Sequence, residues 1–137
     1  MTTYEKLLSA ANRTDAIVSF EPCRVSPSYS LRVDGYSSIF FDEKRLPSSA
    51  EKTAAFAHEL GHCETGSFYN VNTPLETKGR QEYRANKWAV QKVIPWTKLR
   101  IALRQTTALW ELAEHFEVTE DFVLTAIDVY RRQGKLL

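Results

Sequence analysis

Cysteine is scarce in this chain of 137 residues, which contains only Cys23 and Cys63. Two thiols are too few for a small scaffold held together by disulfides. Cys63 directly follows His62, so in a helix its side chain would point about 100° away from that histidine, which makes it a poor metal-ligand candidate. We therefore expect two free thiols and a reducing, cytoplasmic environment.

Long apolar runs and an excess of charge of one sign are absent as well. No segment approaches the roughly 20 apolar residues of a membrane-spanning helix, and the polar start of the chain, Met-Thr-Thr-Tyr-Glu, is unlike a signal peptide. The formal net charge is +1, which argues against strong sequence-independent binding to nucleic acid or to an anionic membrane. We expect a single globular domain over residues 1–137, with no membrane contact and no direct binding of nucleic acid.

Histidine is also rare, yet two of the three histidines lie four residues apart in the segment His58-Glu59-Leu60-Gly61-His62. Residues four apart in an α-helix lie on one face, about 6 Å apart along the axis. His58 and His62 can then bind one zinc ion, and Glu59 is close enough to act on a water molecule beside the metal without being a ligand. The pattern is typical of zinc peptidases, although an amphipathic helix can also carry two buried, hydrogen-bonded histidines at this spacing.

The residues around this motif favour one continuous helix. Ser48 with Glu51 three residues later forms a capping-box pattern, and Gly66 is a candidate C-cap. Gly61 lowers helix stability relative to alanine, so we expect it to serve close packing near the metal.

A third zinc ligand is expected about 20 residues after His62, in a second helical segment that begins near Arg80. Glu82 and Asn86 lie on one face of that helix, so Glu82 is the candidate third ligand and Asn86 a candidate hydrogen-bond partner of a ligand. Ala85 and Ala89 would let the two helices approach closely. The connecting loop, residues 67–79, carries Tyr69, a candidate hydrogen-bond donor to the oxyanion of a peptidase reaction, although a packing role would also explain it.

Strand-like segments precede the motif. A helix is predicted over residues 3–12, and strands over residues 16–20, 29–33 and 36–41, with Asp34-Gly35 as a hairpin turn. We expect an α+β fold in which a small antiparallel sheet precedes the two ligand-bearing helices. The candidate edge strand for pairing with a substrate backbone is Ser37, Ser38, Ile39, Phe40 and Phe41, although a strand that only covers the core fits the pattern equally well.

The C-terminal third reads as a helical cap on a catalytic core of residues 1–96. Helices are predicted over residues 97–105, 107–116 and 119–133, and the last two resemble a helix-turn-helix. A DNA-binding regulator is therefore a rival interpretation. The charges disfavour it, because Glu120 and Asp121 begin the helix that would meet the bases and would repel phosphate. His115 lies in this region and is interpreted as a surface residue.

These motifs together resemble the ImmA/IrrE family of metallo-endopeptidases. The resemblance covers residues 48–96 and rests on His-Glu-Leu-Gly-His, then Glu-x-x-Ala-Asn-x-aromatic-Ala, then an apolar stretch ending in proline. Arg84 stands where many members have an acidic residue, Trp88 replaces the usual phenylalanine, and Val93-Ile94-Pro95 replaces a commoner Leu-Leu-Met-Pro. None of these differences touches a candidate ligand, so they concern the choice of substrate more than the chemistry.

The resemblance implies a zincin-like domain in which His58, His62 and Glu82 bind one catalytic Zn²⁺ and Glu59 is the catalytic base. It also implies a protein substrate, a helix-turn-helix repressor of a prophage or other mobile element, cleaved in the bacterial cytoplasm to relieve repression. Two alternatives stay open beside this reading: an inactive zincin-like binding protein, and the small DNA-binding regulator. Manganese or iron could also occupy a site of this composition.

Overall fold

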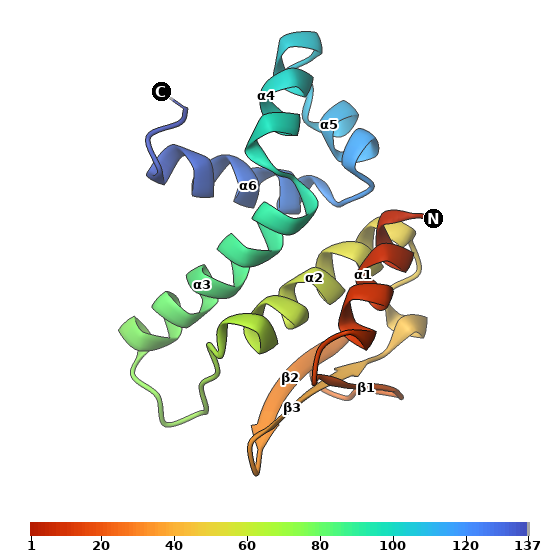
Figure 1. Ribbon diagram of the computed structural model, residues 1–137, viewed down its shortest axis with the longest axis vertical. Coiled ribbons are helices and arrows are strands. Elements are labelled where there is room, and N and C mark those ends of the chain that lie inside the picture. Colours follow the sequence, from red (N-terminus) through yellow and green to blue (C-terminus); the bar gives the residue numbers. More distant parts are fainter. Residues whose placement is uncertain (137) are drawn as a thin grey trace.

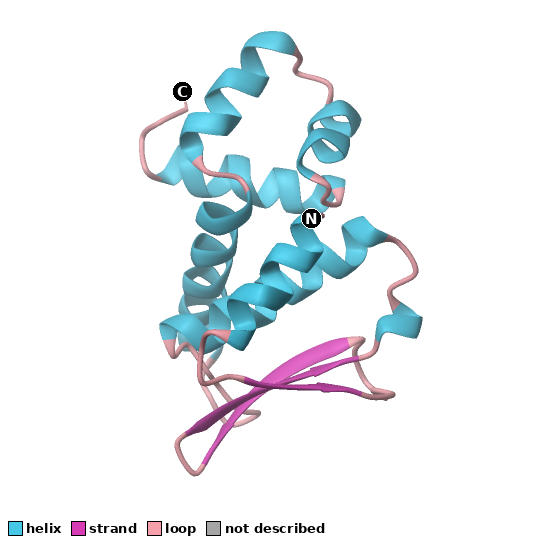
Figure 2. Cartoon of the chain, turned by 45° about the vertical axis from the view of Figure 1, so that its right-hand side comes forward, coloured by secondary structure: helices cyan, strands magenta, loops and turns pink. Residues whose placement is uncertain are grey.

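The computed structural model describes residues 1–136, and within them six α-helices and one three-stranded sheet form an α+β fold, which confirms the predicted fold class (Figure 1). The sheet lies at one end of the molecule with the helices on one side of it (Figure 2). No helix within residues 1–136 is long and apolar enough to cross a membrane. The elements in chain order are α1 (Thr3–Asn12), β1 (Ile17–Phe20), β2 (Ser28–Val33), β3 (Tyr36–Phe41), the 3₁₀ turn η1 (Glu43–Arg45), α2 (Ser49–Thr65), α3 (Leu75–Val93), α4 (Trp96–Gln105), α5 (Leu109–Phe116) and α6 (Glu120–Arg132).

The sheet is mixed, which corrects the prediction of a purely antiparallel sheet. Its strand order is β1-β3-β2, with β2 antiparallel to β3 and β1 parallel to β3. The β2–β3 hairpin is the part that sequence identified, since Asp34 and Gly35 both adopt the positive φ angles of a tight hairpin turn. The short apolar run at residues 16–20 predicts a strand, but it carries no information about the direction in which β1 joins the sheet.

The prediction that Ser37–Phe41 is an edge strand is wrong, because β3 is the central strand. Its main chain pairs with β1 on one side and with β2 on the other. The physical reason is burial: Ile39 and Phe41 point toward the helices and are fully buried, as expected for a strand at the centre of a sheet. The strand with a free edge next to the helix that carries the histidines is β2.

Helix α2 begins and ends where its capping residues indicate. The Ser48 hydroxyl accepts a hydrogen bond from the Glu51 N–H at 3.0 Å, and Gly66 ends the helix with a left-handed φ of 66°. Phe56, Ala57 and Leu60 form its fully buried apolar side. This helix therefore has one face in the core, and that burial fixes which way its polar residues point.

Helix α3 begins at Leu75, directly after Pro74, and so starts about five residues earlier than predicted. It packs closely on α2 because Gly61 lies against the main chain of Ala85. A Cβ atom added at Gly61 would lie 2.4 Å from the Ala85 carbonyl oxygen, a distance that backbone atoms cannot tolerate. The expectation that Gly61 allows close packing is thus explained by a direct contact, and Ala85 and Ala89 are both fully buried.

The three C-terminal helices are present as predicted and lie beyond the C-terminal end of α3, with α6 packed against α3 (Figure 1). Their buried side chains are apolar and belong to one hydrophobic cluster with those of α2, α3 and the sheet. The Tyr130 hydroxyl ties this region down by donating a hydrogen bond to the Ile94 carbonyl at 2.6 Å, at the end of α3. Glu117 joins α5 to α6 in a left-handed conformation, φ 59°, where glycine is common.

Candidate metal centre

Helix α2 directs His58 and His62 to one point. Their Nε2 atoms lie 3.2 Å apart, and the two rings are nearly perpendicular at 89°. His62 is buried and His58 is partly exposed, with 6% and 27% of the side chain accessible. One helical turn thus presents two imidazole nitrogens to the same space, as the four-residue spacing predicts.

Glu82, from α3, completes the cluster. One carboxylate oxygen lies 3.1 Å from His58 Nε2, and the other lies 3.1 Å from His62 Nε2. The predicted three-residue set is therefore together in space, with its ligand atoms all within 4.8 Å of one another. The close packing of Gly61 on Ala85 is what brings α3 near enough for Glu82 to reach the histidines.

The spacing of these donor atoms fits a zinc ion. Two donors about 2.0–2.1 Å from a tetrahedral zinc ion lie about 3.3–3.4 Å apart, close to the 3.1–3.2 Å observed here. Two imidazoles and one carboxylate are also a known ligand set for catalytic zinc, in which the fourth position stays open. The cluster can bind one metal ion, and its composition and geometry suit Zn²⁺.

The other ring nitrogen of each histidine has its own partner. His58 Nδ1 lies 2.7 Å from the side-chain oxygen of Asn86, and His62 Nδ1 lies 2.6 Å from the Ser67 carbonyl. Since both partners are acceptors, a neutral ring carries its proton on Nδ1 and keeps the Nε2 lone pair for the centre of the cluster. Without a metal, a second proton on Nε2 gives the charged ring, which donates a hydrogen bond to Glu82. Asn86 was predicted as such a partner, whereas Ser67 was not, because a carbonyl after a helix end leaves no trace in side-chain patterns.

The charges of the cluster favour a cation at its centre. Burial raises the pKa of Glu82, but hydrogen bonds from the two histidines and Tyr69 outweigh it and hold that pKa well below the usual range of a glutamate. Burial lowers the pKa of His58, but its hydrogen bond to Glu82 and the charges of Glu59 and Glu82 outweigh it and raise that pKa. Both shifts show that positive charge is stabilised where the three side chains meet.

Tyr69 lies beside this cluster, in the loop between α2 and α3. Its hydroxyl donates a hydrogen bond to Glu82 Oε1 at 2.6 Å, and this bond, followed by burial and the charges of Glu82 and Glu59, raises the pKa of Tyr69 to about 12. The hydroxyl thus stays protonated and remains a donor at neutral pH. In the structure the hydroxyl is hydrogen-bonded to Glu82, the candidate third ligand, and a role as donor to an oxyanion stays a prediction.

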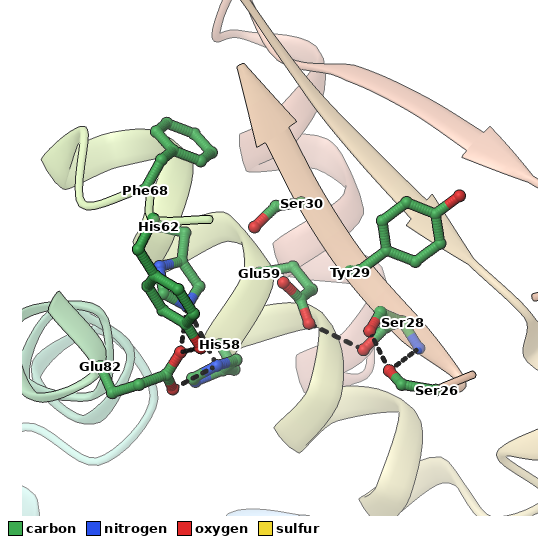
Figure 3. A pocket seen from close by; sticks show the side chains of 10 residues that line it. Ser26, Ser28, Tyr29, Ser30, His58, Glu59, His62, Phe68 and Glu82 are labelled. Carbon is green, nitrogen blue, oxygen red and sulfur yellow. Dashed lines mark hydrogen bonds and ion pairs between the residues drawn. The ribbon is translucent and has the colours of Figure 1, made fainter. Parts of the chain in front are cut away.

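Glu59 is buried beside the two histidines but points to the sheet. Only 6% of its surface is exposed, and its Oε2 accepts a hydrogen bond from the Ser28 hydroxyl at 2.9 Å. Figure 3 shows its carboxylate between the histidine cluster and β2. Together with the cluster it lines a cavity of about 460 Å³.

One wall of this cavity comes from β2 and was missed in the sequence. Ser28 and Ser30 line it together with Ser26 and Tyr29. A signal was available in the hairpin register, in which Ser28 and Ser30 pair with the buried residues Phe41 and Ile39. Two serines on the core-facing side of a strand indicate a polar space between that strand and the next layer.

Other residues considered in the sequence do not belong to the cluster. His115 is exposed on α5, and Cys23 and Cys63 are free thiols. Burial and the charges of Glu59 and Glu64 raise the pKa of Cys63 to about 12, so it is not a reactive thiolate. In the helix-turn-helix-like pair, Glu120 and Asp121 lie exposed at the start of α6.

Comparisons with known proteins place the chain among peptidases. The family model of the IrrE N-terminal-like domain, a peptidase family, matches residues 12–128. This match includes the whole cavity and most of the C-terminal helices. No curated protein and no solved structure matches the chain.

Proposed function

The chain belongs to the family of peptidases with an IrrE N-terminal-like domain and is a zinc metallo-endopeptidase of the ImmA/IrrE type; from this premise we propose that it cleaves a helix-turn-helix repressor. The observation that carries the proposal is that His58, His62 and Glu82 converge at zinc spacing next to a buried carboxylate, Glu59. A protein that only binds a partner has no need of a buried acid beside a metal site.

In this proposal the three clustered side chains hold the metal, and Glu59 transfers the proton. When bound, a zinc ion would polarise the peptide carbonyl and lower the pKa of a water molecule beside it. The Glu59 carboxylate takes a proton from the attacking water and later gives it to the departing amine nitrogen. Asn86 and the Ser67 carbonyl keep the two histidines in the tautomer that binds metal.

The free edge of β2 is the proposed binding place for an extended substrate segment. The Asp42 N–H, just after β3, donates to the Pro27 carbonyl, so Pro27 directs its main-chain carbonyl toward β3. Successive residues of an antiparallel strand direct their N–H and C=O groups to opposite sides, so Ser28, Ser30 and Arg32 direct these groups to the free edge. The N–H and the carbonyl of Ser28 are already hydrogen-bonded to the Ser26 hydroxyl. The groups of Ser30 and Arg32 are left to pair with a substrate backbone beside the cavity.

A helix-turn-helix repressor is the proposed substrate because ImmA/IrrE-like proteins typically act on such regulators. The same resemblance points to a repressor of a prophage or other mobile element, and we place the cleavage in the bacterial cytoplasm. Cleavage would separate the DNA-binding part of the repressor from the rest and so relieve repression.

The first test is the zinc content of the purified full-length protein by elemental analysis. Wild type should carry about one zinc ion, and Glu82→Ala should lose it. The control is Glu76→Ala on the same helix, because the Glu76 side chain is 84% exposed and lies outside the cluster. Unchanged zinc in Glu82→Ala would reject Glu82 as a ligand. A wild type without metal, even after zinc is added, would favour the binding-protein interpretation.

The second test is co-expression with a helix-turn-helix repressor from the same genome. We expect two repressor fragments with wild type and an intact repressor with Glu59→Gln. An intact repressor beside zinc-loaded wild type would contradict the proposed substrate while leaving the metal site untouched.

A further inference from the structure

Glu59 shares a hydrogen bond with a residue far away in the sequence. The Ser28 hydroxyl, on β2, donates to Glu59 Oε2 at 2.9 Å across 31 residues of chain (Figure 3). The contact joins the strand on one side of the cavity to the helix on the other. It is the one hydrogen bond that the described residues make to the Glu59 side chain.

Ser28 is itself held in place on two sides. Its N–H donates to the Ser26 hydroxyl at 3.2 Å, and that hydroxyl donates back to the Ser28 carbonyl. On its other side β2 pairs with β3, where Ser28 lies opposite the fully buried Phe41. The main chain of this serine is therefore held from both sides, so its short side chain presents the hydroxyl to Glu59 from a fixed backbone position.

A glutamate needs such a point. The terminal torsion of a glutamate side chain has broad, shallow minima, so burial of the chain does not by itself fix the plane of the carboxylate. A hydrogen bond from a fixed hydroxyl to one oxygen does fix this plane. Because Ser28 engages Oε2, the other oxygen is left free of bonds to the described residues, and Glu59 contributes to the lining of the cavity.

We infer that Ser28 is a positioning residue, which holds the Glu59 carboxylate by Oε2 so that Oε1 faces the reacting water. This inference rests on the proposed role of Glu59 as proton carrier. It assigns to the strand a part in the chemistry that goes beyond pairing with substrate: β2 aligns the base through a side chain while its main-chain edge aligns the peptide. Both alignments then come from one rigid element.

The test compares Ser28→Ala and Ser28→Thr with wild type, all as zinc-loaded full-length protein. The matched control is Ser19→Ala, a serine on β1 at the opposite edge of the sheet. Turnover is followed on the helix-turn-helix repressor used above and on β-casein, an unfolded protein substrate. Zinc content is measured for every variant, and thermal unfolding is measured for Ser28→Ala in the wild-type and Glu59→Ala backgrounds.

We expect Ser28→Ala to lower kcat about tenfold or more, the loss that corresponds to a hydrogen bond to a charged group. KM should stay within about twofold and zinc content should not change, since the metal ligands and the strand edge are intact. Ser28→Thr, which keeps a hydroxyl, should recover most of kcat. The melting temperature should fall on removal of the Ser28 hydroxyl in the wild-type background and not in Glu59→Ala, where no carboxylate remains to be held.

The inference would be overturned by a kcat for Ser28→Ala equal to that of Ser19→Ala, or by a loss of kcat that Ser28→Thr does not recover. Equal falls in melting temperature in both backgrounds would also reject the contact, and this measurement needs no turnover. Failure of the proposed function looks different. In that case wild type cleaves neither substrate, or Glu59→Gln stays as active as wild type.

Discussion

The first half of this molecule, from α1 to α3, and its second half, helices α4, α5 and α6, bury different kinds of side chain. In the described residues, the buried polar or charged side chains are Asp42, Thr53, Glu59, His62 and Ser67, all of them before α3. Helices α4, α5 and α6 bury apolar residues and the ring of Tyr130. A buried polar group costs about 1–3 kcal/mol unless it is hydrogen-bonded. The first half must therefore supply a hydrogen-bond partner for each of these groups, whereas the second half has few such groups to satisfy.

This difference separates the residues that do chemistry from those that hold them in place. Around His62 and Glu59 each buried polar group has a partner, and the partners come from several elements: β2, the end of α2, and α3. In the C-terminal helices the contacts are mainly packing, with Tyr130 as the polar exception. Substitutions of the cluster, of Glu59 or of their hydrogen-bond partners should change metal binding or turnover, whereas substitutions in α4, α5 and α6 should change stability alone.

The strongest test of this contrast is Glu59→Gln. The substitution keeps the shape of the side chain and its acceptor for Ser28 but removes the proton acceptor. We expect turnover to fall by about 10²–10⁴-fold, the usual contribution of general acid–base catalysis, with zinc content unchanged. Repressor cleavage and elemental analysis measure the two quantities. A variant that still cleaves at the wild-type rate would show that this buried acid has no role in the chemistry.

Asn86→Ala should have the next largest effect. Loss of the acceptor for His58 Nδ1 frees the ring to rotate and to change tautomer, so zinc affinity should fall about 10–100-fold. Competition with a zinc-binding dye measures this affinity. The control is Lys87→Ala, the adjacent exposed residue of α3. Equal affinities for the two variants would mean that Asn86 only fills space.

Gly61→Ala tests whether the two ligand-bearing helices are held at the required separation by one residue. The new methyl group would meet the Ala85 carbonyl, and we expect a loss of about 1–3 kcal/mol in the free energy of unfolding, together with weaker zinc binding. Gly79→Ala on α3 is the matched control. Nothing lies within 4 Å of a Cβ atom at Gly79, so alanine should stabilise that helix by up to about 1 kcal/mol. Urea unfolding distinguishes the two outcomes, and a stabilised Gly61→Ala would contradict the close contact.

The smallest expected effect lies in the other half of the molecule. Tyr130→Phe removes the hydrogen bond to the Ile94 carbonyl and should lower the free energy of unfolding by about 0.5–1.5 kcal/mol. Zinc content and kcat should match those of wild type when measured well below the melting temperature. A loss of zinc in this variant would show that the C-terminal helices help to form the site, and the contrast between the two halves would then fail.

What the sequence predicts well is local. Periodicity and capping residues predict the bounds of α1, β3 and α6 to within one or two residues. They also predict the Asp34-Gly35 turn and the Gly66 cap. The meeting of Glu82 with the two histidines was also predicted, because each lies on a helix whose buried face is marked by small or apolar residues. In these cases the residues that allow the prediction lie within the predicted element itself.

What it does not predict is pairing between distant segments. The parallel alignment of β1 with β3 and the central place of β3 depend on which strands become neighbours. The contact of Ser28 with Glu59 depends on the packing of β2 against α2. Alternating residues define the two faces of a strand but not its neighbours. The early start of α3 was missed for another reason, since Glu76, Gly79 and Arg80 are exposed and show no apolar face.

The free edge of β2 has a further consequence, for the behaviour of the protein in solution. Main-chain groups that can accept a substrate strand can equally accept the same strand of a second molecule, and Leu31 and Val33 on this strand are 43% and 58% exposed. A peptidase that keeps such an edge open therefore carries a site for aggregation. A substrate-like peptide bound to this edge should keep concentrated protein monomeric. The main-chain N–H and C=O groups of β2 that bind substrate would then also determine the solubility of the protein.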